Sequence, residues 1–222
     1  MKNSLIIALV LLAQMTFAQV TKNLGDFDRV KVFDKLNVKL IPASENKIII
    51  VGDRENDVEI VNKNGELKIR MPFHKLLSGE DISVKLYFKN IESISASEGS
   101  YVSSEKTIKQ TSIDLNSKEG SRINLDLDVK NVNSKANSGG IIELSGNATN
   151  QNINITSGAS LKAKDLQTSI TAINISGGGK AEIKASTLVN AKVKAGGSVY
   201  IYGKPKQINK EIFLGGIITE RN

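Results

Sequence analysis

Six glycines recur at an interval of 19 residues through the second half of the chain, and this regularity constrains the fold more than any other feature. Each glycine lies in a turn of small residues, such as Thr156-Ser157-Gly158-Ala159. On both sides of the turns apolar residues alternate with polar ones, as in Ile153-Asn154-Ile155, which predicts strands with one buried face. The glycines are Gly120, Gly139, Gly158, Gly177, Gly196 and Gly215.

A repeat of this length predicts an all-β fold, a single-stranded right-handed parallel β-helix (β-solenoid) with coils of about 19 residues. It is too short for a propeller blade, and a β-sandwich does not explain a fixed interval. Successive coils then lie ~4.8 Å apart, so that equivalent residues stack in columns. We expect the glycines to be structural, because a tight corner needs a positive φ and stacked corners leave no room for Cβ. In the fourth turn, Gly178 fits the glycine column better than Gly177.

The N-terminal residues predict export. Lys2 precedes the apolar run Leu5–Leu12, and Thr16-Phe17-Ala18 supplies a cleavage site of the small-x-small type before Gln19. Residues 1–18 are therefore an expected signal peptide, too short to span a membrane, and no later apolar run is long enough to be a transmembrane span.

The rest of the chain divides into two parts. Residues 19–95 contain alternating strand patterns without the glycine column, and we interpret them as irregular N-terminal coils that cap the solenoid. Residues 96–222 are the expected regular coils, so that 19–222 forms one continuous domain. The alternative is a separate small β-domain over residues 24–94.

Basic residues are concentrated near the C-terminus. Residues 19–160 carry 19 basic and 19 acidic residues, whereas residues 161–222 carry 10 basic and 4 acidic ones. Such a patch can meet an anionic glycan or another component of the cell envelope, and its ordinary alternative is a solvated lysine-rich face. We do not expect nucleic acid as a partner, and the oligomeric state stays open.

No catalytic site, metal site or cofactor is predicted. The chain has no Cys, which excludes zinc bound by thiolates, and its single His74 has no G-x-S-x-G motif to complement it. Asp126 and Asp128 are the best carboxylate pair, because residues two apart on a strand lie ~6.6 Å apart, near the lower limit for inverting glycosidases. The next coil places only Ser145 and Asn147 beside them.

The repeat also predicts which outward side chains stack. The column four places after the corner glycine contains Asn124, Glu143, Lys162, Glu182, Tyr200 and Thr219, and the column two places further contains Asp126, Ser145, Lys164, Lys184, Tyr202 and Arg221. Tyr200, Tyr202, Lys164 and Lys184 thus form a candidate ligand site, with rings that stack on a sugar and ammonium groups that pair with its charge. The alternative is that the tyrosines only cover the last coils. A weaker column is expected through Asn131, Asn150 and Ser169, which keep the spacing, and it resumes two residues late at Asn190 and Asn209.

Several segments together resemble the head GIN domain, a family of auto-transporter adhesins. They are the opening segment Phe27–Pro42, the segment Ile48–Asp53, the segment Asn64–Ile69, and the glycine-punctuated coils to Leu214–Ile217. The resemblance implies a right-handed β-helix and export in a Gram-negative bacterium, to the periplasm or the cell surface. It supplies no catalytic residues.

These observations favour an exported, non-enzymatic binding or adhesion module of the cell envelope, with a glycan as the expected ligand. The alternative is a carbohydrate-active enzyme, a polysaccharide lyase or hydrolase, on the same scaffold.

Overall fold

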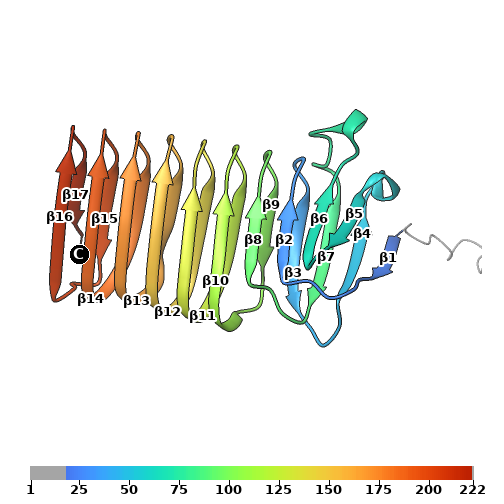
Figure 1. The fold of residues 1–222 in the computed structure, drawn as a ribbon, viewed down its shortest axis with the longest axis horizontal. Helices are drawn as coiled ribbons and strands as arrows, with labels where there is room; N and C mark the ends of the chain where they lie inside the picture. Colours follow the sequence, from blue (N-terminus) through green and yellow to red (C-terminus); the bar gives the residue numbers. More distant parts are fainter. Residues whose placement is uncertain (1–18, 222) are drawn as a thin grey trace, which may run out of the picture.

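The computed structural model describes residues 19–221, which form a 17-stranded sheet that coils around one apolar core (Figure 1). The expected signal peptide lies outside the described residues. The strands are β1 (Gln19–Asn23), β2 (Arg29–Val32), β3 (Asn37–Pro42), β4 (Lys47–Val51), β5 (Glu59–Lys63), β6 (Glu66–Arg70), β7 (Ser83–Phe88), β8 (Ser93–Ala96), β9 (Tyr101–Ser104), β10 (Ile108–Ser117), β11 (Arg122–Ala136), β12 (Ile141–Thr156), β13 (Ser160–Ser176), β14 (Lys180–Lys194), β15 (Ser198–Tyr202), β16 (Gln207–Phe213) and β17 (Ile217–Glu220), with short 3-10 helices η1 (Glu55–Asp57) and η2 (Phe73–Lys75).

The regular coils stack side by side along the long axis of the molecule (Figure 1). Strands β11 to β14 are parallel to one another, and Arg122 pairs with Ile141, which pairs with Ser160. This register confirms the predicted parallel β-solenoid with coils of about 19 residues.

Each coil has two opposite faces. The post-turn face consists of the segments that follow each glycine corner, from β9 through the first halves of β11–β14 to β15 and β17. The pre-turn face consists of the segments that precede each corner, from β8 and β10 through the second halves of β11–β14 to β16. These two names are used below.

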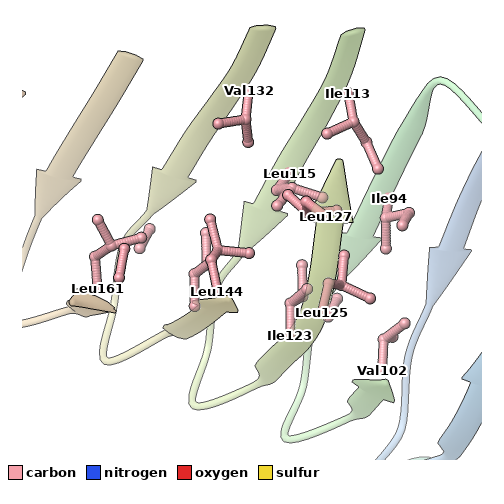
Figure 2. Close-up of a cluster of buried hydrophobic side chains, with 14 of the residues drawn as sticks. Ile94, Val102, Ile113, Leu115, Ile123, Leu125, Leu127, Val132, Leu144 and Leu161 are labelled. Carbon is pink, nitrogen blue, oxygen red and sulfur yellow. The ribbon is translucent and has the colours of Figure 1, made fainter. Parts of the chain in front are cut away.

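The core lies between the two faces. Leu125 and Leu144 of the post-turn face and Leu115 and Val132 of the pre-turn face belong to one buried apolar cluster (Figure 2). All four are buried, as the alternating sequence pattern requires. Burying one such aliphatic side chain contributes roughly 1.5–3 kcal/mol, so stacked inward columns stabilise every coil.

The corners are four-residue turns whose two central residues both have positive φ. Ser157 (φ 50°) and Gly158 (φ 72°) are an example, and the amide of Ala159 donates to the carbonyl of Thr156 at 3.2 Å. Positive φ at both central positions is the geometry of a type I′ turn, which glycine adopts without strain. In the fourth corner Gly177 (φ 70°) and Gly178 (φ 80°) take the two central positions, so Gly178 does occupy the glycine column.

The expectation that the column glycines leave no room for Cβ is wrong. A Cβ on Gly139 or Gly158 would meet nothing within 4 Å, whereas a Cβ on Gly140, the residue after the column, would lie 2.2 Å from the carbonyl oxygen of Ser117. The column position is therefore constrained by backbone conformation, whereas Gly140 is constrained by space. The constraint at the second position is local to its corner, since Ser121 and Ala159 carry a Cβ at the equivalent place. The two roles are separated because the turn tips project outward while the next residue returns against the neighbouring coil.

The N-terminal part of the chain is arranged differently. Strands β2 and β3 lie between the coil of β6 and β7 and the coil of β8 and β9, with parallel pairing on both sides. Strands β1, β4 and β5 add antiparallel pairs beyond them. Spatial order thus departs from chain order within residues 19–104.

One corner in this part is replaced by a long loop. Residues 71–82 connect β6 to β7 and carry η2, which projects beyond the corners at the top of Figure 1. Asp34, only 1% exposed, holds the loop by accepting hydrogen bonds from the amides of Met71 (2.9 Å) and Leu77 (3.1 Å).

Candidate anion-binding site

The candidate site begins with a bulge in β13. The pairing of β13 with β14 moves from Ala163–Ile183 to Gln167–Lys184, so the intervening residues of β13 have no partner on β14. A bulge re-aims side chains, and here Lys164 and Asp165 are exposed while Leu166 returns to the core. The expected pairing of Lys164 with Lys184 is therefore wrong, because the extra residues of β13 displace it from the column.

Lys184 and Tyr202 are direct neighbours on the post-turn face, as expected. Together with the bulge they surround a hollow of about 380 Å³. Its wall is formed by Lys164, Asp165, Lys184, Tyr202, Gly203, Lys204 and Arg221. The structure thus brings three of the four predicted ligand-binding residues together, although Lys164 arrives by a different route.

Tyr200 does not line this hollow. It points outward like Tyr202, because the neighbouring Val199 and Ile201 are buried. Its ring lies 5.2 Å from the ammonium of Lys180 and 5.1 Å from the guanidinium of Arg221, both measured to the ring centroid. Two cation–π contacts therefore occupy Tyr200, and it helps to position Arg221.

The first outward column follows the prediction. Glu143 pairs with Lys162, Lys162 with Glu182, and Glu182 with Tyr200. Lys162 lies 2.7 Å from Glu143, and Lys180 lies 2.7 Å from Glu182. The hydrogen bond from Lys180 to Glu182 raises the pKa of Lys180 above its ordinary value.

In the described part of the chain, the cations around the hollow lack the carboxylate partners that the lysines beside the first outward column have. Within residues 19–221, Lys164, Lys184, Lys204 and Arg221 form no ion pair with a carboxylate. Four unpaired cations surround a space that contains one carboxylate, Asp165. Chemically, this arrangement suits an anion with hydrogen-bond acceptors, with the Tyr202 ring beside it.

The predicted site lacked four lining residues, namely Asp165, Gly203, Lys204 and Arg221, although Arg221 was expected in the column of Tyr202. Asp165 is placed by the bulge, which the spacing of glycines cannot locate. Lys204 follows Gly203, whose φ of 88° turns the chain after β15. A Cβ at Gly203 would lie 2.6 Å from the carbonyl oxygen of Ala185, so this glycine brings the chain close to the preceding coil. The Gly203-Lys204 dipeptide is the one sequence signal that could have indicated the position of Lys204.

The carboxylates considered for catalysis have other partners. Asp126 accepts hydrogen bonds from Thr107 (2.5 Å) and Ser145 (2.8 Å), and Asp128 lies 3.5 Å from Lys109. His74 is exposed on the long loop. The part of the chain that the structure describes contains no group of three potential metal-ligating His, Asp or Glu side chains.

A family model described as "Putative auto-transporter adhesin, head GIN domain" matches residues 26–205. The chain belongs to this family. The match covers the irregular N-terminal coils and the hollow as far as Lys204. No helix in residues 19–221 of this head GIN domain is long and apolar enough to cross a membrane.

Solved structures share the fold at low sequence identity. A "putative adhesin" from Bacteroides fragilis is 16% identical with a TM-score of 0.85, and one from Parabacteroides distasonis is 19% identical with a TM-score of 0.76. A "putative lipid binding protein" from Parabacteroides distasonis is 16% identical with a TM-score of 0.70. Each alignment covers 92% of this chain and 96% of the other. No curated protein gave a significant match.

Proposed function

We propose that this protein is an exported, non-enzymatic adhesion module of the cell envelope that binds an anionic glycan in the hollow beside Tyr202. The observation that carries the proposal is the set of four cations without carboxylate partners in the described chain, gathered around about 380 Å³ of space. Membership of an adhesin family supports export and binding as the general role. Cleavage before Gln19 is part of the proposal, and N-terminal sequencing of the exported protein tests it.

The ligand proposal is tested with polygalacturonate, a polymer with one carboxylate on each sugar. The double variant Lys184→Ala/Lys204→Ala should bind about tenfold more weakly or worse and show a reduced dependence on salt. Tyr202→Ala should weaken binding without changing the salt dependence.

The matched control is Lys63→Ala/Lys130→Ala, which removes the same charge from exposed lysines outside the hollow. Equal losses in both double variants would show that net charge alone attracts the polymer and would overturn the site.

The catalytic alternative uses Asp126. Its two hydrogen bonds to hydroxyl groups favour a structural role in the coil stack. Release of unsaturated or reducing ends from polygalacturonate by the wild-type protein, abolished in Asp126→Asn, would replace the adhesion proposal by an enzymatic one.

A second candidate function is contact with a lipid surface. The long loop exposes Phe73 (89%), Leu76 (51%) and Leu77 (49%) beyond the corners. Its fixed anchorage on Asp34 keeps these apolar side chains outward, and a structural neighbour is described as lipid-binding.

Sedimentation with phosphatidylglycerol vesicles tests this contact. Phe73→Ser/Leu76→Ser should reduce the bound fraction severalfold, whereas Val61→Ser, which removes an exposed apolar group outside the loop, should not. Unchanged sedimentation of the loop variant would remove this candidate.

A further inference from the structure

The outer surface of the pre-turn face carries amide side chains at successive coils. Its first column runs from Asp114 through Asn133 to Asn152, and it continues at Asn190 and Asn209 after an interruption. Ala172 is the interruption, since it pairs with Asn152 on one side and with Asn190 on the other. The sequence assigned Asn190 and Asn209 to the column of Asn131 with a delay of two residues. That assignment is wrong, because the column of Asn131 continues to Leu188 and Gln207, and the two-residue delay places both amides in the column of Asn152.

A second column lies two positions nearer to the corners. It passes through Asn116, Lys135, Asn154 and Asn174. Ser169, expected beside Asn150, is replaced there by Ile170 for the same reason of register. The pre-turn face thus presents two parallel rows of short polar side chains.

Hydrogen bonds between coils hold the first row in place. Asn152 donates to Asn133 at 3.1 Å, Asn133 donates to Asp114 at 2.7 Å, and Asn209 donates to Asn190 at 2.7 Å. Each ladder bond uses one of the two N–H groups of an amide, which leaves a donor and carbonyl lone pairs for a ligand. Because these hydrogen bonds already order the amide side chains, little further conformational entropy is lost when a ligand binds them.

Two hollows lie one after the other along the two rows, and together they are called the groove below. One hollow of about 360 Å³ spans β8, β10, β11 and β12, and its floor includes the backbone of Leu115 and Ser134, whose side chains are buried. A second hollow of about 490 Å³ spans the next coils, β13, β14 and β16. Together they extend along the axis for roughly 30 Å at the usual spacing of stacked strands.

The charges along this groove balance. The first hollow contains one carboxylate, Asp114, and one ammonium group, Lys135. In the second, Lys192 and Lys210 are ion-paired with Glu211 and Glu220. An anionic polymer therefore finds no excess of cations here, in contrast to the hollow beside Tyr202.

We propose that this groove binds an uncharged linear polysaccharide that lies along the solenoid axis. The hydroxyl groups of a neutral sugar chain are both donors and acceptors, as the amides are, and its residues repeat at a distance close to that between coils. A peptide strand would need unpaired backbone groups for strand addition, and the interior coils of this face are paired on both sides. This site goes beyond the proposed anion site, which lies on the post-turn face.

Binding is measured by isothermal titration with the hexasaccharides of cellulose, β-1,3-glucan and β-1,4-mannan. We expect at least one to bind, with affinity that rises from disaccharide to hexasaccharide because longer chains contact more coils. Absence of binding by all three at millimolar concentration, or affinity independent of length, would overturn the proposal.

The variant Asn116→Ala/Asn154→Ala removes two amides of the second row and leaves the hydrogen-bonded first row intact. It should weaken hexasaccharide binding by about tenfold or more. Asn147→Ala, an exposed amide of the post-turn face, is the matched control and should bind normally. Equal binding by the groove variant and the wild type would place the sugar elsewhere.

Failure of this proposal is distinguishable from failure of the anion site. Polygalacturonate binding should be unchanged in Asn116→Ala/Asn154→Ala, and binding of the neutral hexasaccharide should be unchanged in Lys184→Ala/Lys204→Ala. If one double variant removes both activities while its melting temperature stays normal, the two ligands share a site and the groove assignment is wrong.

Discussion

The two faces of the solenoid share one backbone and one core but carry different outward chemistry. On the post-turn face, charged side chains alternate in sign between coils, as in Glu143 and Lys162 at 2.7 Å. On the pre-turn face, amides bond to amides, as in Asn152 and Asn133 at 3.1 Å. Parallel stacking therefore specifies the inward columns closely and leaves the outward columns free to differ. In this fold, binding specificity can be built on one face without altering the other.

The largest expected effect comes from the corner, where both faces depend on the same turn. Gly140→Val would place Cβ 2.2 Å from the carbonyl oxygen of Ser117. Backbone cannot move aside as a flexible side chain can, so we expect a loss of about 3 kcal/mol or more in the free energy of unfolding, measured by urea denaturation.

Gly139→Ala is the control for this change. Its φ is 72°, but a Cβ there meets nothing within 4 Å. Gly139→Ala should lower the free energy of unfolding by only about 1 kcal/mol, because a residue with a Cβ is strained in the left-handed backbone conformation. Equal losses at the two glycines would contradict the separation of conformational and spatial roles.

A charge reversal should separate the two faces. Lys162→Glu places a third carboxylate between Glu143 and Glu182, its partners on the adjacent coils. We expect a loss of about 1 kcal/mol at low salt that shrinks at high salt, because exposed charges are screened. Asn152→Ala on the amide face should show a loss that salt does not change. A salt-independent loss for Lys162→Glu would remove the electrostatic difference between the faces.

The inner side of the pre-turn face contains a buried amide without a partner in residues 19–221. Gln151 is 1% exposed, and its amide makes no hydrogen bond with any described residue. Replacing a buried polar group that lacks a partner by an apolar one of similar shape removes its desolvation cost. Gln151→Met should therefore raise the free energy of unfolding by about 1 kcal/mol. Gln167→Met, at an exposed position, should leave it unchanged, and a destabilised Gln151→Met would show that the amide is satisfied in solution.

The smallest expected effect concerns Glu98, which lies in the corner that joins the two faces before β9. Burial, reinforced by the nearby Asp34 and Glu119, raises the pKa of Glu98 above its ordinary value of 4.5. The fold therefore prefers neutral Glu98, so stability is lost as the pH rises from the ordinary value of 4.5 through the raised pKa, above which the loss is complete. Glu98→Gln should raise the melting temperature slightly at about pH 7 and not at about pH 4, where the acid is already neutral. An equal change in melting temperature at both pH values would contradict this cause.

Much of the candidate site could be predicted from spacing. The alternation Val199-Tyr200-Ile201-Tyr202 places both tyrosines outward, and the corner register makes Lys184 the neighbour of Tyr202. The spacing could not predict that Lys164 enters through a bulge, or that Lys180 and Arg221 cover Tyr200. Bulges depend on how two coils of unequal length share one core, and side-chain contacts depend on the position of the chain beyond β15.

The sequence by itself determined the solenoid, because glycine spacing and period-two alternation are local signals that repeat in every coil. It also determined which side chains of the regular coils face outward. Only the tertiary structure decided the insertion of β2 and β3 between later strands, the two hollows along the amide rows, and the lack of room for a Cβ at Gly140. These features arise from contacts between coils. Their geometry depends on how neighbouring segments pack together, and no single segment of the chain encodes that packing.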